Sequence, residues 1–135
     1  MTFRSLVPSF TTPALAANLA FYRDILGFTC TATLGDPDAP DWVELTRGEV
    51  RIMLLAAEAK DLQKVFFQGT GVIFYFTVSD LERVHADLIA AGHEVTEIEV
   101  TFYGMRECYA TDPDGRQLTF AEPSREGDVV TITEL

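Results

Sequence analysis

The chain repeats one pattern of elements, and this repeat limits the folds it can adopt. Each half reads as a strand, an amphipathic helix, a glycine turn and a run of strands. The landmarks recur at a nearly constant offset, with 66 positions from Leu15 to Leu81, 65 from Gly27 to Gly92 and 67 from Gly48 to Gly115. Such a constant offset is typical of a duplicated unit. The repeat predicts an α+β fold of two tandem βαβββ modules, at about residues 1–58 and 69–122, followed by a tail over 123–135.

Composition excludes several classes of partner. The 135 residues carry a formal net charge of −11, so we expect no nucleic acid, because binding it requires an excess of Lys and Arg. We also expect no membrane partner, since no apolar run approaches the ~20 residues of a membrane-spanning helix. Cys30 and Cys108 lie in separate apolar stretches without metal-site spacing, which predicts free thiols in a cytoplasmic protein.

Local signals place the two helices. Thr12 and Pro13 predict an N-cap and a first helical residue, and Leu15, Leu19, Tyr22 and Leu26 then share one helical face. In the second half, Ser79 and Glu82 predict a capping box ahead of Leu81, Val84 and Leu88. Both helices are therefore expected to cover a sheet.

Strand alternation divides the remaining side chains between two faces. The face expected beneath the helices carries Leu6, Pro8, Phe10, Ile52, Leu54, Phe74, Phe76, Val78, Leu118 and Phe120. The opposite face carries Val7, Ser9, Trp42, Glu44, Arg51, Met53, Ile73, Tyr75, Glu107, Tyr109, Gln117 and Thr119. The rings and carboxylates of this second set suit the lining of a ligand site, and a solvent-facing sheet is the alternative.

Three stretches of the chain are informative beyond the repeat: LAFYRDILGF, the run Tyr-Gly-Met-Arg-Glu at 103–107, and Asp-Pro-Asp-Gly at 112–115. Together with the repeat, they resemble the glyoxalase/bleomycin-resistance/extradiol-dioxygenase superfamily, also called vicinal oxygen chelate. The bleomycin-resistance branch is the most similar, with Val7-Pro8 in the first strand, Tyr103 in place of a Trp and Arg116 in place of an Asn. The resemblance implies a single domain with a curved mixed sheet, a cup, and helices on its outer face.

Metal-dependent members of this superfamily place their ligands at positions that the resemblance carries to Val7, Met53, Ile73 and Thr119. Val and Ile offer no donor atom, and Met and Thr suit hard divalent ions poorly. We therefore expect no metal and no cofactor. His85 and His93 lie in a helix and a turn without ligand spacing, and are expected to be ordinary surface residues.

The resemblance implies a metal-free protein that binds a small molecule, as bleomycin-resistance proteins confer antibiotic resistance by sequestering a drug. The expected ligand is planar and partly cationic, and the expected lining is Ser9, Trp42, Glu44, Met53, Tyr75, Tyr103, Glu107, Tyr109 and Thr119. Phe66, Phe67 and Phe102 are expected at a rim or in a dimer contact.

Other readings stay open. One is an enzyme of the same superfamily, a lyase or dioxygenase, whose metal would be held by residues other than the four at the expected ligand positions. Glu44 and Glu107 could also form a general acid/base pair, or together hold a cation. Another is a scaffold whose cup is filled by its own side chains. The size of the modules and Pro8, which cannot donate a strand hydrogen bond, predict a homodimer with the first strand at an edge or exchanged between chains.

Overall fold

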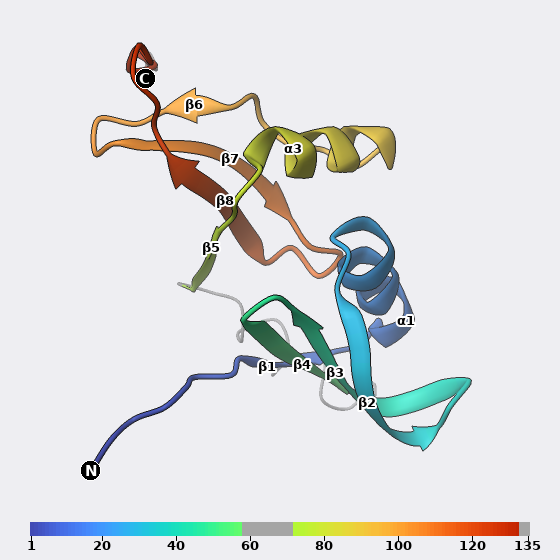
Figure 1. Cartoon of the computed structure of the whole chain (residues 1–135). Helices are drawn as coiled ribbons and strands as arrows, with labels where there is room; N and C mark the ends of the chain where they lie inside the picture. Colours follow the sequence, from blue (N-terminus) through green and yellow to red (C-terminus); the bar gives the residue numbers. More distant parts are fainter. Residues whose placement is uncertain (58–71, 133–135) are drawn as a thin grey trace. The chain divides into compact units, whose positions relative to one another are not determined.

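The computed structural model describes residues 1–57 and 72–132. The chain divides into two compact units, Met1–Thr70 and Gly71–Leu135. Each unit holds a strand, a helical segment and three further strands in that order (Figure 1), so the predicted βαβββ repeat is confirmed. Phe66 and Phe67, expected at a rim or in a dimer contact, lie outside the described residues.

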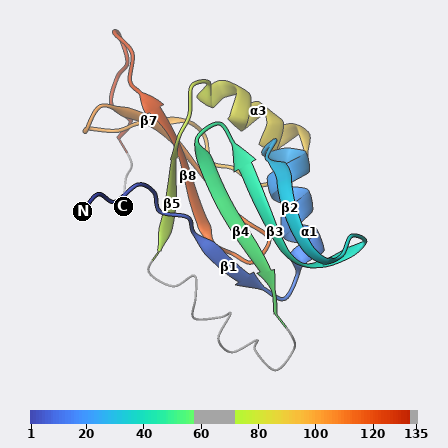
Figure 2. The same ribbon diagram turned by 60° about the horizontal axis from the view of Figure 1, so that its bottom comes forward.

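The first unit is a four-stranded sheet with a helical segment against one face (Figure 2). Its order is β1-β4-β3-β2, with β1 parallel to β4 and the other pairs antiparallel. The elements are β1 Ser9–Thr12, α1 Leu15–Leu19, the π-helix η1 Ala20–Ile25, β2 Thr29–Asp36, β3 Ala39–Arg47 and β4 Val50–Ala56.

The second unit repeats this topology with the order β5-β8-β7-β6, and β5 is parallel to β8. Its elements are β5 Ile73–Thr77, α3 Leu81–Ala90, β6 Glu99–Val100, β7 Met105–Thr111 and β8 Gln117–Pro123. The turn between β7 and β8 is closed by Asp112, whose carboxylate accepts hydrogen bonds from the backbone N–H groups of Asp114 and Arg116. The buried Arg116 guanidinium pairs with Asp112 at 2.9 Å.

The first helix begins later than the sequence predicts. Thr12 is not its N-cap; the cap position is Ala14, which makes no side-chain capping bond. The Thr12 hydroxyl instead accepts hydrogen bonds of 3.0 Å from the Ala14 N–H and the Asn18 side-chain amide. Thr12 therefore holds the entry to the helix from the end of β1.

The predicted apolar face of this helix is also only partly correct, because the helix changes to π-helical winding. The Leu26 N–H donates to the Phe21 carbonyl, five residues earlier. Phe21 and Tyr22 in this wider turn and Asn18 just before it are buried, whereas Leu15 and Leu19 are half-buried. An even 3.6-residue period does not anticipate that shift.

The helix of the second unit is capped by Asp80, not by the predicted pair of Ser79 and Glu82. The Asp80 carboxylate accepts from the Arg83 N–H at 3.2 Å. Leu81, Val84 and Leu88 are buried as predicted.

The core follows the predicted alternation, except at the start of the chain. Leu54 and Leu118 are fully buried, and Phe76 stacks on Phe120 with ring centroids 5.6 Å apart. Leu6, predicted beneath a helix, is 91% exposed because β1 begins only at Ser9.

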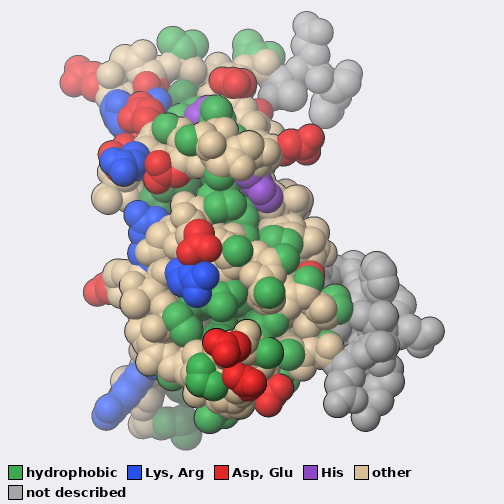
Figure 3. All heavy atoms as spheres, turned by 90° about the vertical axis from the view of Figure 1, so that its right-hand side faces the viewer, with side chains coloured by type: hydrophobic (Ala, Val, Ile, Leu, Met, Phe, Trp, Pro, Cys, Tyr) green, Lys and Arg blue, Asp and Glu red, His purple; other side chains and the backbone are tan. Residues whose placement is uncertain are grey.

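The surface reflects the acidic composition. Figure 3 shows acidic side chains in several separate places on the face turned to the viewer, with fewer basic ones. Within residues 1–57 and 72–132, no helix has the length and apolar character needed to span a membrane.

Candidate functional site

A row of side chains crosses the second sheet on the face opposite α3. Tyr75 on β5 is paired with Thr119 on β8, and Thr119 is paired with Tyr109 on β7. Their neighbours Leu118 and Phe120 point to the other face and are buried. The alternation of the strands thus brings three predicted site residues together.

Glu107 lies two residues from Tyr109 and completes this group. Its Oε2 accepts a hydrogen bond of 2.5 Å from the Tyr75 hydroxyl. Its Oε1 accepts hydrogen bonds of 2.6 Å from Tyr103 and 2.8 Å from Tyr109. Glu107 is only 1% exposed, so these three hydroxyls take the place of water around a buried carboxylate. We call Tyr75, Tyr103, Glu107 and Tyr109 the tyrosine cluster.

The cluster keeps its carboxylate ionised and its phenols protonated. Burial alone would raise the pKa of the Glu107 carboxyl, but the bonds from the three tyrosines outweigh it and hold the pKa below its ordinary value. Burial, and then the bond to Glu107, raises the pKa of Tyr75 to about 12. The same causes raise the pKa of Tyr109. A negative charge is therefore fixed beneath neutral rings.

The rings, and not the carboxylate, are what the cluster offers to a ligand. Tyr103 is 55% exposed and Tyr75 is 48% exposed, while Tyr109 is half-buried. Thr119, predicted as a lining residue, is buried between Tyr75 and Tyr109. A cation above the rings would meet π-faces made more electron-rich by hydroxyls that donate to an anion.

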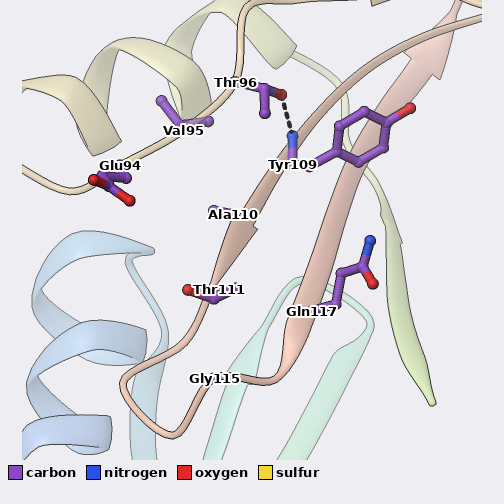
Figure 4. A pocket seen from close by; sticks show the side chains of 8 residues that line it. All are labelled: Glu94, Val95, Thr96, Tyr109, Ala110, Thr111, Gly115 and Gln117. Carbon is purple, nitrogen blue, oxygen red and sulfur yellow. Dashed lines mark hydrogen bonds between the residues drawn. The ribbon is translucent and has the colours of Figure 1, made fainter. Parts of the chain in front are cut away.

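A surface hollow of about 620 Å³ adjoins Tyr109. One side is the segment after α3, where Thr96 accepts a hydrogen bond of 2.9 Å from the Tyr109 N–H (Figure 4). Tyr109 and Gln117 project on the same side of the β7–β8 pair in this view. The lining residues are Glu94, Val95, Thr96, Tyr109, Ala110, Thr111, Gly115 and Gln117. The hollow thus extends the face of the cluster toward groups that can form hydrogen bonds.

The first unit carries the equivalent row with different chemistry. Ser9 is paired with Met53, and Met53 with Glu44, at the places that Tyr75, Thr119 and Tyr109 occupy in the second unit. The Thr31 hydroxyl donates to Glu44 at 2.8 Å, and Arg51 lies 3.9 Å from the Glu44 carboxylate.

Trp42 lies two residues from Glu44 on β3 and is half-buried. This row has a single carboxylate without a ring of phenols, and its Ser9 is exposed. The predicted lining residues therefore include one group within the first unit and another within the second unit.

A known protein family matches the chain over both modules of the repeat. The model of the Glyoxalase/Bleomycin resistance protein/Dioxygenase superfamily matches residues 7–120. The chain belongs to this superfamily. No curated protein matched the sequence.

Solved structures of the superfamily's fold cover nearly the whole chain. A bleomycin-binding protein from bleomycin-producing Streptomyces verticillus, complexed with copper(II)-bleomycin, is 23% identical with a TM-score of 0.63, over 93% of this chain and 99% of that one. TnmS3, an antibiotic binding protein from Streptomyces sp. CB03234, is 21% identical with a TM-score of 0.66, over 92% and 100%. A glyoxalase-related enzyme from Clostridium phytofermentans is 18% identical with a TM-score of 0.68, over 91% and 97%. At these identities the likeness shows the fold.

The four residues expected at metal-ligand positions have side chains that do not suit a hard divalent ion. Val7 and Ile73 have hydrocarbon side chains, Met53 has a thioether, and Thr119 has a neutral hydroxyl on a buried residue. Across the described ranges, His, Cys, Asp and Glu form no group of three or more suited to a metal ion.

Both histidines contact backbone carbonyls of residues that line the hollow. Nε2 of His85 lies 3.1 Å from the Thr96 carbonyl, and Nε2 of His93 lies 2.7 Å from the Thr111 carbonyl. Cys30 and Cys108 are free thiols, and burial raises the pKa of Cys108 to about 11. That shift leaves Cys108 a poor nucleophile.

Sequence reasoning missed two features of the site. It assigned Tyr75, Tyr103 and Tyr109 only to the lining, although Tyr75 and Tyr109 are expected on the same sheet face as Glu107 and their hydroxyls could have been paired with its carboxylate. It did not find Glu94 and Thr96, because they lie on a segment without strand periodicity.

Proposed function

We propose that this chain binds a planar aromatic cation on the face of the second unit that carries the tyrosine cluster. The observation that carries the proposal is the buried Glu107 carboxylate held by three phenols. Two half-exposed rings cover a fixed negative charge, which is the arrangement that favours a flat cation over a neutral ring. The net charge of −11 would also raise the local concentration of cations.

The hollow beside Tyr109 gives the ligand a second region to contact. Its rim includes the Glu94 carboxylate and the Gln117 amide, which can accept and donate hydrogen bonds. We infer a ligand with a flat cationic part over the cluster and a polar part in the hollow. Bleomycin and other antibiotics are bound by proteins of this fold, which supports a role in drug sequestration.

Catalysis is less well supported by the same residues. A lyase or dioxygenase would need either a metal, for which Val7, Ile73 and Met53 are unsuited, or an acid/base group. Glu107 is held ionised by its three hydrogen bonds, so it is a weak base. We therefore infer a metal-free binding protein that acts without a cofactor.

We further propose that the protein is a cytoplasmic homodimer. Phe3 and Leu6 are each 91% exposed in the segment ahead of β1, and β1 lies at an edge of its sheet. A second copy of the chain would cover these apolar side chains. Free Cys30 and Cys108 suit a reducing compartment.

The proposed function is tested with two probes of one shape, the cation N-methylquinolinium and the neutral methylnaphthalene. We expect the cation to bind more tightly in titration calorimetry and to raise the melting temperature more. A ligand at 100 times its Kd stabilises a protein by about 2.7 kcal/mol. Added salt should narrow the difference between the probes, because only the charge contribution is screened. If the two probes bind equally, the carboxylate has no role; if neither binds, the face is a packed scaffold.

A further inference from the structure

The C-terminal segment, residues 124–132, forms hydrogen bonds on both sides of Tyr103, to Val100 at the end of β6 and to Gly104 in the loop between β6 and β7. The Ser124 N–H donates to the Gly104 carbonyl at 2.9 Å, directly after Tyr103. The Thr131 N–H donates to the Val100 carbonyl at 2.8 Å, and the Thr131 hydroxyl accepts from the Val100 N–H at 2.9 Å. Over residues 124–132 the segment makes these bonds without forming a strand.

The loop has little packing of its own to fix Tyr103. Phe102 is 87% exposed, and its ring meets the Tyr103 ring edge-on at 5.1 Å. Within the loop, the Thr101 hydroxyl accepts from the Met105 N–H at 3.1 Å, and Gly104 has a φ of +83°, which other residues rarely adopt. An exposed loop with few apolar contacts is held chiefly by such hydrogen bonds.

A network of charges fixes the C-terminal segment to α3, β7 and β8 within the second unit. Arg106, with 14% of its side chain exposed, donates to Glu122 at 2.8 Å and to Glu82 at 3.0 Å. Arg125 donates to the same two carboxylates at 3.0 and 3.1 Å. Asp128 closes the turn by accepting from the Arg125 N–H at 2.8 Å, and it lies 3.6 Å from Arg106. Several charges that share partners hold a segment better than one exposed pair does.

Tyr103 differs from the other phenols of the tyrosine cluster in its support. Tyr75 and Tyr109 lie within strands β5 and β7, whose ladders fix their backbones. Tyr103 lies in the loop, and its hydroxyl must still reach Glu107 at 2.6 Å. Hydrogen bonds between Thr101 and Met105 close the loop around it, and the C-terminal segment adds a contact on each side, at Val100 and Gly104.

We propose that residues 124–132 are a positioning element that holds the Tyr103 hydroxyl on Glu107. The positioning of Tyr103 follows from these contacts alone. The effect of that positioning on a ligand rests on the proposed function. Tyr103 is then a positioned contact residue, and Arg125, Asp128 and Thr131 act on the site only through it.

The test uses the full chain with the substitutions Arg125→Gln, Asp128→Asn and Thr131→Val combined, and Thr131→Val alone as a milder variant. Glu126→Gln is the matched control, since Glu126 is an exposed carboxylate in the same turn that makes no ion pair with the described residues. NMR of ring-labelled tyrosine follows each phenol, and Tyr103→Phe assigns the Tyr103 signal. The hydrogen bond to Glu107, and then burial, raises the pKa of Tyr103, so its release should lower that pKa while Tyr109 is unchanged.

Binding of N-methylquinolinium gives the second readout. We expect the combined variant to bind the probe about fivefold more weakly, because a fivefold change in Kd corresponds to the free energy of about one hydrogen bond. Adding Tyr103→Phe to it should cause no further loss, because the two changes act on one contact. An unchanged Tyr103 signal in the combined variant overturns the positioning role and leaves the proposed function intact. A shifted Tyr103 signal with unchanged probe binding supports the positioning role and contradicts the part of Tyr103 in the proposed function.

Discussion

Tyr75 and Glu107 lie on strands that are not neighbours, yet the Tyr75 hydroxyl donates a hydrogen bond of 2.5 Å to the Glu107 carboxylate. Strand β8 separates them, and there Ala121 is the residue paired with Glu107. A methyl group at this place leaves room for the Tyr75 ring to reach across the sheet. The contact joins two residues that are 32 positions apart in the sequence.

Substitutions of Tyr75 should separate its ring from its hydroxyl. Tyr75→Ala removes a half-exposed ring and should weaken the binding of both probes. The expected loss of affinity for the cation is about two- to fivefold, as for an exposed cation–π contact. Tyr75→Phe keeps the ring and removes the donor to Glu107. It should therefore weaken binding of the cation less than Tyr75→Ala does, and leave binding of methylnaphthalene unchanged. Calorimetric titration of both variants measures this. Equal binding by wild type and Tyr75→Ala would place the site elsewhere.

Alkaline pH should destabilise the protein through the same contact. The pKa of Tyr75 is raised to about 12 in the folded chain, above the ordinary value of 10.0. The protonated phenol therefore contributes stability that is complete below about pH 10 and is lost as pH rises toward 12. The pH dependence of the urea midpoint should be less steep over this range in Tyr75→Phe than in wild type. Identical slopes would show that Tyr75 ionises equally easily in the folded and unfolded chains.

The sequence predicted the elements of the fold well because the repeat and the strand alternation are strong signals. The burial of Ile52, Leu54 and Leu118 follows from period-two spacing alone. The predicted start of the first helix was wrong because the Thr12 hydroxyl accepts hydrogen bonds from Ala14 and Asn18 without capping the helix. The π-helical turn was not predicted because no sequence period reveals it.

The candidate site was less accessible to sequence reasoning. Alternation could place Tyr75 and Glu107 on one face, but only the register of β5, β8 and β7 sets their distance. The hydrogen bond from the Thr131 N–H to the Val100 carbonyl depends on where the C-terminal segment folds back, which no sequence pattern specifies.

Metal removal should leave the protein unchanged. Because Val7, Met53, Ile73 and Thr119 form a poor donor set, we expect purified protein to lack stoichiometric zinc, iron, manganese and nickel. Dialysis against EDTA should not change the melting temperature. Elemental analysis that finds one metal ion per chain, removed by EDTA with loss of stability, would contradict this.

The oligomeric state is predicted to depend on the N-terminal segment. We expect a homodimer in sedimentation velocity at tens of micromolar, because Phe3 and Leu6 need a partner to leave water. The substitutions Phe3→Ser and Leu6→Ser should shift the protein toward monomer. The control is Leu34→Ser, an exposed leucine on β2. A wild-type monomer at this concentration rules the dimer out.

Glu107→Gln tests the central claim most directly. The change keeps the shape of the side chain and removes the charge that three hydroxyls hold in place, so it should also lower the free energy of unfolding by about 1–3 kcal/mol. The deciding measurement is calorimetric titration of this variant and wild type with N-methylquinolinium and methylnaphthalene. We predict that the cation binds the variant roughly tenfold more weakly, through loss of a nearby charge, while the neutral probe binds both proteins alike. Equal weakening of both probes, or of neither, would contradict a cation site built on Glu107.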